Sequence, residues 1–190
     1  MWQFSRSSIL SLLILAVLGP LVRAAPPDIG QKAPDFALPT VTDKIVRLSE
    51  LTSKGPVVVI VLRGYPGYQC PFCNRQAQDF LQRSRAFAEV AAHVVMVYPG
   101  PAQELKARAQ EFIAGKTVPR NIEVLLDSGY EFTNLYGLRW EAPRETAYPS
   151  TFVIDRNGVV FFRKIAKEHG GRATAAEVLE ALAKHSTFQR

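Results

Sequence analysis

Residues 57–73 read VVVIVLRGYPGYQCPFC and join an apolar run to the only two cysteines of the chain. The first six residues are continuously apolar and mostly β-branched, which predicts a central strand covered on both faces. Cys70 and Cys73 follow with the spacing C-x-x-C, and residues 71 to about 91 return apolar side chains at the period of a helix. The stretch therefore predicts a strand, a loop, and a helix that begins with two thiols.

The spacing of the thiols favours redox chemistry. With no other cysteine, the chain is not using disulfides to staple its fold. A thiol attacks only as the thiolate, and a helix N-terminus stabilises that anion. Cys70 is predicted at the N-cap and Pro71 at the first helical position, where a missing N–H is tolerated. We predict that Cys70 is the exposed nucleophile of low pKa and that Cys73, one turn further on, is the resolving thiol.

Two other roles for a pair of cysteines are packing in the core and binding of a metal. Both thiols could be small core residues, but their place at the start of a helix after a buried strand argues against packing alone. A structural zinc site needs four ligands. His93, His169 and His185 are scattered, with no paired spacing and no second C-x-x-C. We expect no bound metal, and we expect His169, in His-Gly-Gly-Arg, to be a surface loop residue.

Beyond the first helix the chain continues to alternate strands and helices. Strands are predicted at 94–98 and 122–126 from their apolar, β-branched composition. A helix is predicted between them, from about 102 to 114, and a helical turn follows at 132–136.

The last part of the chain predicts a hairpin and a helix. Residues 151–162 hold two apolar runs joined by Asp-Arg-Asn-Gly, and Asn-Gly supplies the positive φ angles of a tight turn. The last helix starts at Thr174, with Glu177 placed to complete a capping box. The order of elements predicts an α/β fold with a central mixed β-sheet flanked by helices, in one domain over residues 25–190.

The N-terminus predicts a cleaved signal peptide over residues 1–24. Arg6 lies in a short polar region, residues 9–19 are almost wholly apolar, and Val22-Arg23-Ala24 offers small or neutral residues to a signal peptidase. We expect cleavage after Ala24 and a mature protein in the periplasm or outside the cell. The alternative is an uncleaved membrane anchor, although the run is short for a span of about 20 residues.

The charge of the chain argues against a nucleic-acid surface. The formal net charge is +6, and it falls to +4 without residues 1–24, which hold Arg6 and Arg23 and no acid. The basic pairs at 106–108 and 163–164 lack interleaved aromatic side chains. We expect no nucleic-acid partner, and a membrane contact only if the N-terminal segment stays uncleaved.

The motifs resemble those of the thioredoxin superfamily. CPFC at 70–73 after an apolar strand, with YPSTFVID at 148–155, is similar to the dithiol and the proline loop of that superfamily. GQKAPDFALP at 30–39, followed by VRLSEL at 46–51, resembles the opening of its redoxin branch. That branch holds the alkyl hydroperoxide reductase and thiol-specific antioxidant (AhpC/TSA) proteins and related periplasmic thiol–disulfide proteins. The likeness runs over residues 29–184.

The resemblance implies a thioredoxin-like thiol–disulfide oxidoreductase of the cell envelope. Cys70 and Cys73 would cycle between dithiol and disulfide with no bound cofactor. The implied partners are protein or small-molecule thiols and disulfides, and a redox partner that recycles the pair. By the same likeness, Pro149 is a cis-proline that faces the dithiol. The candidate substrate-binding residues are Arg63, Tyr68, Tyr148 and Pro149; Tyr65 and Trp140 are further aromatic candidates for lining a groove around Cys70.

The chain departs from the peroxiredoxins where they activate peroxide. They place Thr or Ser three residues before the peroxidatic Cys and Pro seven before it, and this chain has Gly67 and Arg63. The arginine that many of them carry before the Thr-Phe-x-Ile-Asp strand is replaced by Tyr148-Pro149. A peroxiredoxin-like peroxidase is therefore the second hypothesis, with hydroperoxides as substrates and a Cys70 sulfenic acid that Cys73 closes to a disulfide.

A third hypothesis is a copper chaperone similar to the Sco proteins, which share the redoxin fold. Those proteins use two cysteines and a histidine just before the hairpin strand, and here that place holds Tyr148-Pro149.

One further departure concerns the thiol–disulfide reductases, which often carry Glu three residues after the second Cys. This chain has Gln76 there.

Overall fold

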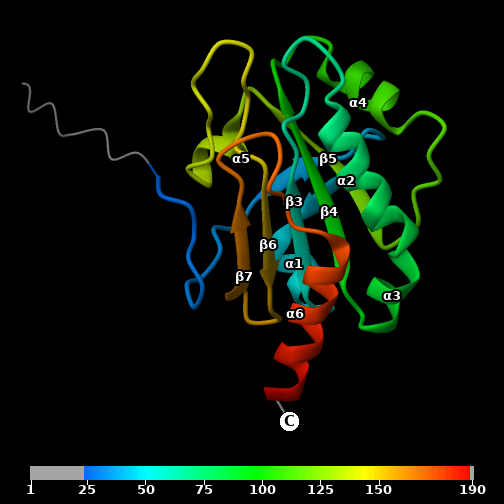
Figure 1. The fold of residues 1–190 in the computed structure, drawn as a ribbon, viewed down its shortest axis with the longest axis vertical. Coiled ribbons are helices and arrows are strands. Elements are labelled where there is room, and N and C mark those ends of the chain that lie inside the picture. The colour runs from blue at the N-terminus through cyan, green and yellow to red at the C-terminus, as the bar shows by residue number, and fades with distance from the viewer. Residues whose placement is uncertain (1–23, 189–190) are drawn as a thin grey trace, which may run out of the picture.

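The structure, a computed structural model, describes residues 24–188 of the 190-residue chain. Residues 1–23 of the predicted signal peptide lie outside the described residues. The main sheet has five strands in the order β5-β4-β3-β6-β7 (Figure 1). Their bounds are β3 Val57–Val61, β4 His93–Gly100, β5 Ile122–Ser128, β6 Ser150–Ile154 and β7 Val160–Ile165.

The sheet is mixed, as predicted. Strands β3, β4 and β5 run parallel, β6 pairs antiparallel with β3, and β7 pairs antiparallel with β6. Every residue of β3 is buried, because both faces of the sheet are covered. The carboxyl ends of the three parallel strands meet at one edge, and the segment that leads to the dithiol leaves from the end of β3 there.

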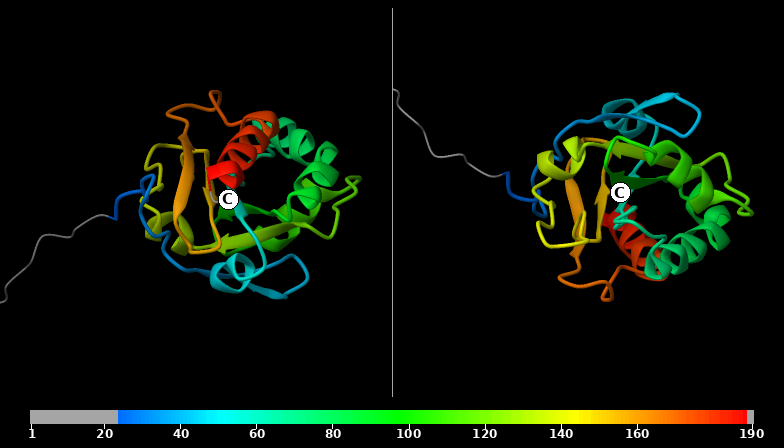
Figure 2. Two further views of the ribbon diagram at one scale, coloured as in Figure 1. Left: turned by 90° about the horizontal axis from the view of Figure 1, so that it is seen from below. Right: turned by 90° about the horizontal axis from the view of Figure 1, so that it is seen from above.

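Helices and a small hairpin cover the two faces of the sheet (Figure 2). Val58 and Ile60 of β3 point into one core, and Val57 and Val59 point into the other. The first core lies under α2 Pro71–Gln82, α3 Ser84–Glu89, α4 Leu105–Ile113 and α6 Ala175–Phe188. The second lies under α1 Leu48–Thr52, α5 Glu131–Leu135 and the antiparallel pair β1 Ala37–Pro39 and β2 Ile45–Arg47.

The prediction of one helix over 71–91 was wrong. The helix breaks at Arg83, with φ −101° and ψ 13°, and α3 continues from Ser84. The break allows Phe87 to bury completely and to stack on Phe80, with ring centroids 5.4 Å apart. Ala88, which the period of one continuous helix would place on the same face as Ala77 and Phe80, is exposed instead. Burial of two aromatic rings therefore outweighed the continuation of the helix.

The hairpin of β6 and β7 is confirmed, but its turn is not the predicted one. Within the turn only Gly158 has a positive φ, at 74°. The Asp155 carboxylate accepts hydrogen bonds from the N–H groups of Asn157 and Val159, each at 2.8 Å. The aspartate thus closes a longer turn in which Asn157 needs no left-handed backbone.

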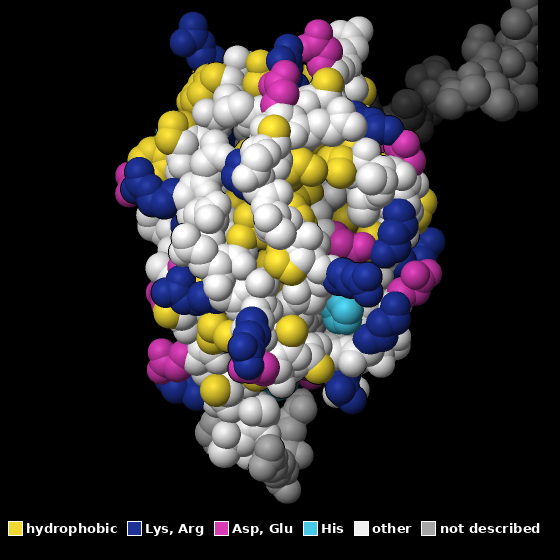
Figure 3. All heavy atoms as spheres, turned by 90° about the vertical axis from the view of Figure 1, so that its right-hand side faces the viewer, with side chains coloured by type: hydrophobic (Ala, Val, Ile, Leu, Met, Phe, Trp, Pro, Cys, Tyr) yellow, Lys and Arg dark blue, Asp and Glu magenta, His cyan; other side chains and the backbone are white. Residues whose placement is uncertain are grey.

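The capping box of α6 is confirmed. The Thr174 N–H donates to the Glu177 carboxylate at 2.7 Å, and the Glu177 N–H donates to Thr174 Oγ1 at 3.2 Å. Over residues 24–188, no helix is both long and apolar enough to span a bilayer. On the face shown in Figure 3, basic and acidic side chains are interspersed and form no continuous basic patch.

Candidate dithiol active site

The segment between β3 and α2 holds the dithiol against the sheet. Gly64 has φ 70°, and a Cβ at this position would meet the Pro99 carbonyl oxygen of β4 at 1.9 Å. Only glycine allows this close approach. The Tyr65 N–H then donates to the Pro99 oxygen at 3.1 Å. Further along, Gln69 accepts from the Tyr98 hydroxyl at 2.9 Å, so the segment that leads to the dithiol is anchored to β4 at two points.

Cys70 is the N-cap of α2, and Pro71 opens the helix, as predicted. Its backbone is extended, with φ −73° and ψ 118°, and its carbonyl accepts the first intrahelical bond from Asn74. The prediction that Cys70 is exposed was wrong, because the residue is only 2% exposed. Its side chain belongs to the core cluster that also holds Cys73, so the sulfur lies just beneath the surface.

The surroundings of Cys70 favour its thiolate. A hydrogen bond from the Cys73 thiol, opposed by burial, lowers the pKa of Cys70 to about 5. The backbone N–H of Cys73 and the Arg172 guanidinium add to the effect, as does the N–H of Phe72. Both N–H groups belong to the first turn of α2, where unpaired backbone donors stabilise an anion.

Cys73 is the neutral partner of the pair. It is 1% exposed, and burial together with the Cys70 thiolate raises its pKa above the ordinary value of a thiol. Its sulfur accepts the Arg63 N–H at 3.2 Å and Arg172 Nη1 at 3.5 Å. One thiolate and one thiol, joined by a hydrogen bond within one helical turn, form a pair that can attack and then resolve.

The low pKa of Cys70 predicts the pH dependence of its alkylation. Because only the thiolate reacts, the rate with iodoacetamide should rise with pH through a midpoint of about 5. Cys73→Ala removes the hydrogen-bond donor and should move the midpoint toward the ordinary value near ~8.5. Cys73→Ser keeps a donor and is the matched control. A wild-type midpoint at the ordinary value would contradict the assignment.

Arg63 is a buried anchor. Its side chain is 1% exposed, its Nε donates to Glu145 Oε2 at 2.5 Å, and Nη1 donates to the Tyr68 hydroxyl at 2.6 Å. Nη2 donates to the Arg144 carbonyl oxygen. Burial opposes its charge, but Glu145 and Tyr68 raise the pKa of Arg63 above its ordinary value. Each of the three nitrogens thus makes one hydrogen bond inside the fold, which accounts for three of the five N–H donors of the guanidinium. The substrate-binding role of Arg63 stays a prediction.

Aromatic side chains surround the site on one side. Trp140 stacks on Tyr148 with ring centroids 4.8 Å apart, and His169 packs edge-on against Trp140 at 5.5 Å. His169 also lies 6.2 Å from Phe72 and contacts Glu145 Oε1 through Nε2 at 3.0 Å. The structure therefore brings Tyr148 and His169 to the dithiol region. His169 lies in a loop, as predicted, and is half-buried, with 35% of its side chain exposed.

Pro149 differs from the cis-proline that the resemblance implied. The described residues contain no cis peptide bond, so the Tyr148–Pro149 bond is trans. The trans form is the favoured isomer of an X–Pro bond. Pro149 is buried, and its carbonyl accepts the Ala166 N–H at 2.8 Å, which ties it to the segment after β7.

Arg172 is the site residue that the sequence analysis missed. It comes from the segment before α6, and its Nη1 reaches both Cys73 Sγ and Gln76 Oε1. It also lines a groove of about 570 Å³ along α2, with Phe72, Arg75 and Gln76 on the opposite wall. The signal was present in the sequence, because Gly170-Gly171 before the capping box marks a segment that can turn back sharply.

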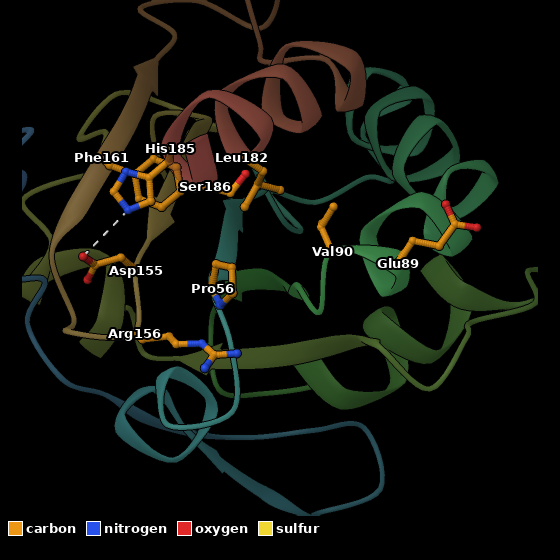
Figure 4. Close-up of a pocket in the computed structure, with 9 residues that line it drawn as sticks. All are labelled: Pro56, Glu89, Val90, Asp155, Arg156, Phe161, Leu182, His185 and Ser186. Atoms are coloured by element: carbon orange, nitrogen blue, oxygen red, sulfur yellow. Dashed lines mark ion pairs between the residues drawn. The ribbon is translucent and has the colours of Figure 1, made fainter. Parts of the chain in front are cut away.

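A second cavity lies at the opposite end of the sheet (Figure 4). It has a volume of about 340 Å³ and is lined by Pro56, which precedes β3, whereas Cys70 follows the far end of that strand. The His185 ring stacks on Phe161 at 3.8 Å, and its Nε2 lies 3.9 Å from Asp155. This cavity is separate from the dithiol.

Comparisons with known proteins agree with the geometry. The sequence pattern of the AhpC/TSA family matches residues 29–163. Peroxiredoxin Bcp of Bacillus subtilis is 30% identical over 166 residues, which cover 82% of this chain and 94% of that protein. The crystal structure of peroxidoxin BcpB from Mycobacterium tuberculosis superposes with a TM-score of 0.64 at 26% identity, covering 86% of this chain and 99% of that one. A structure described as a putative thiol:disulfide interchange protein DsbE from Chlorobium tepidum gives 0.60 at 29% identity, covering 82% and 99%.

Proposed function

The chain belongs to the AhpC/TSA family of thioredoxin-like oxidoreductases, and from that membership we propose that it exchanges thiols and disulfides through Cys70 and Cys73. Cys70 attacks a disulfide sulfur of the substrate, and Cys73 then resolves the mixed disulfide. The two sulfurs carry the electrons, so no bound cofactor is needed. We also keep the proposal that the protein works in the cell envelope.

The observation that carries the proposal is the asymmetry of the two thiols. Cys70 at the helix N-cap has its pKa lowered to about 5, while Cys73 stays protonated and is hydrogen-bonded to it. An attacking thiol must be ionised, and a resolving thiol must wait until the first has reacted. The likeness to the DsbE-type structure supports the same activity.

A thiol peroxidase is the second candidate, and the likeness to peroxiredoxins favours it. Near the dithiol, however, the donors that could polarise a peroxide differ from the family pattern. Gly67 offers no hydroxyl, and Arg63, at the other position of the family pattern, is 1% exposed and bonds Glu145 and Tyr68 inside the fold. We therefore place disulfide exchange first.

The two candidates are separated by the oxidant that the reduced protein prefers. Trp140 lies beside the dithiol region, so its fluorescence should report oxidation in stopped-flow mixing. We expect the reduced protein to react faster with oxidised glutathione than with hydrogen peroxide. We expect its reaction with hydrogen peroxide to be no faster than that of free cysteine. Cys70→Ser is the control for both oxidants. Rapid oxidation by peroxide and slow exchange with glutathione would reverse the assignment.

The copper hypothesis has the least support. Within residues 24–188, no group of three or more His, Cys, Asp or Glu side chains lies together in a way that could hold a metal ion. The place that a Sco protein gives to its histidine holds Tyr148 and Pro149, and both are engaged in packing and backbone contacts.

A further inference from the structure

The sulfur of Cys73 lies in a site built for an anion. It receives the Arg63 N–H at 3.2 Å and Arg172 Nη1 at 3.5 Å, from two segments that are distant in the sequence. A neutral thiol gains little from such donors, whereas a thiolate gains much, because hydrogen bonds to an ionised acceptor are about twice as strong. The two donors therefore suit the thiolate, which is the reacting form of Cys73, better than the thiol, which is its resting form.

Arg172 is held in place without being neutralised. Its Nε donates to the His169 carbonyl at 2.8 Å, and its Nη1 donates to Gln76 Oε1 at 3.0 Å. Gln76 in turn donates to the Ala173 carbonyl at 3.2 Å, which closes the arrangement around Arg172. In the part of the chain that the structure describes, none of these hydrogen-bond acceptors is a carboxylate. The positive charge is therefore available to an anion at Cys73.

One nitrogen of Arg172 adds an independent observation. Nη2 is buried and makes no hydrogen bond to any residue of the described chain. Buried donors are nearly always paired, so an unpaired one beside a reactive sulfur calls for an explanation. In the dithiol state, Arg172 therefore keeps an unpaired donor. That donor can stabilise negative charge that develops on a nearby sulfur when the dithiol reacts.

We propose that Arg172 is a catalytic residue of the resolving step, where it stabilises the Cys73 thiolate. This inference rests on the proposed function. In the mixed disulfide, Cys73 gives its proton to solvent, and its thiolate attacks the Cys70 sulfur. The Cys70–Cys73 bond forms, the bond from Cys70 to the substrate sulfur breaks, and the substrate leaves as a thiolate that takes up a proton. In the reverse direction Cys73 leaves as the thiolate, and the Arg63 N–H and Arg172 Nη1 stabilise it through the same hydrogen bonds.

The charges around Cys73 fit this sequence of events. Burial and the neighbouring Cys70 thiolate raise the pKa of Cys73, and Arg172 lowers it. Once Cys70 is bonded to a substrate sulfur it carries no charge, so its opposition to ionisation of Cys73 disappears. Arg172 then remains as the cation that lowers the pKa of Cys73.

The two chemical steps can be observed separately with an aromatic disulfide. When reduced protein is mixed with 5,5′-dithiobis(2-nitrobenzoate), attack by Cys70 releases one thionitrobenzoate, and attack by Cys73 releases the second. For Arg172→Gln we expect the second release to slow by about 10- to 100-fold, the range for losing a hydrogen bond to a charged group. Its pH midpoint should move upward, while the first release should change much less.

Matched variants separate this role from a structural one. Arg172→Lys keeps the charge and should recover part of the second rate. Gln76→Glu places a carboxylate beside Nη1 and should slow the second release with the arginine still present. Arg75→Gln removes an exposed charge from the wall of the same groove and should leave both phases unchanged.

Two results would be decisive against the inference. A second phase in Arg172→Gln with the wild-type rate and pH midpoint would overturn it while leaving the proposed function intact. If the wild-type protein released only one thionitrobenzoate, the dithiol would not resolve, and the proposed function would fail together with the role of Arg172.

Discussion

Replacing Cys70 by serine is expected to abolish disulfide exchange, with a loss on the order of a thousandfold or more, as for other enzymes that lose their nucleophile. A serine hydroxyl is not ionised at neutral pH and cannot store electrons in a disulfide. The N-cap position should tolerate the change, because serine is a preferred N-cap residue. The measurement is turnover of a disulfide substrate with a recycling reductant in excess.

Cys73→Ser is the matched variant, and it should fail differently. Cys70 keeps a hydrogen-bond donor and stays reactive, so the first attack should proceed at close to the wild-type rate. Without a resolving thiol the mixed disulfide should accumulate, and mass spectrometry should find one substrate thiol bound at Cys70. If Cys70→Ser accumulated the adduct and Cys73→Ser did not, the roles of the two cysteines would be exchanged.

The local part of this site could be predicted from the sequence. An apolar strand, a C-x-x-C pair and Pro71 at the first helical position fix the N-cap of α2, because each signal acts over a few residues. The mixed sheet followed from the order and composition of its strands. The break at Arg83 did not, since a continuous helical period gave no sign that Phe87 would stack on Phe80.

The long-range part could not be predicted. Arg63 was recognised as a candidate, but its partner Glu145 lies 82 positions away, in a segment with no distinguishing pattern. Arg172 lies 99 positions from Cys73 and reaches it only because the segment before α6 folds back over α2. Contacts of this kind depend on the packing of segments that each look ordinary in sequence, and only the folded chain shows them.

The burial of Cys70 has a consequence for how the protein meets its substrate. A sulfur that is 2% exposed offers little surface to a large partner, although the residues beside it, Tyr68 and Phe72, are 44% and 39% exposed. We expect a substrate to meet these two exposed side chains before it reaches the sulfur of Cys70.

Loss of the buried ion pair behind the dithiol should strongly destabilise the fold. In Glu145→Ala, the guanidinium of Arg63 stays buried at 1% exposure without its carboxylate. Breaking a buried pair in this way costs about 3–5 kcal/mol, because one charge is left uncompensated. Urea denaturation should show this loss in the free energy of unfolding. Glu180→Ala is the control, since its 2.6 Å pair with Lys184 is exposed and should contribute at most about 1 kcal/mol.

The pH dependence of this loss identifies its cause. The hydrogen bonds from Arg63 and His169, opposed by burial, hold the pKa of Glu145 below its ordinary value. A carboxyl group with a lowered folded-state pKa stabilises the fold above its unfolded pKa, and the contribution is lost as pH falls through the folded value. The difference between wild type and Glu145→Ala should therefore be full at neutral pH and shrink in acid. In the double variant Arg63→Met/Glu145→Leu, part of the stability should return, because no buried charge remains to be compensated. Equal losses in Glu145→Ala and Glu180→Ala would show that the Arg63 pair is no stronger than a surface contact.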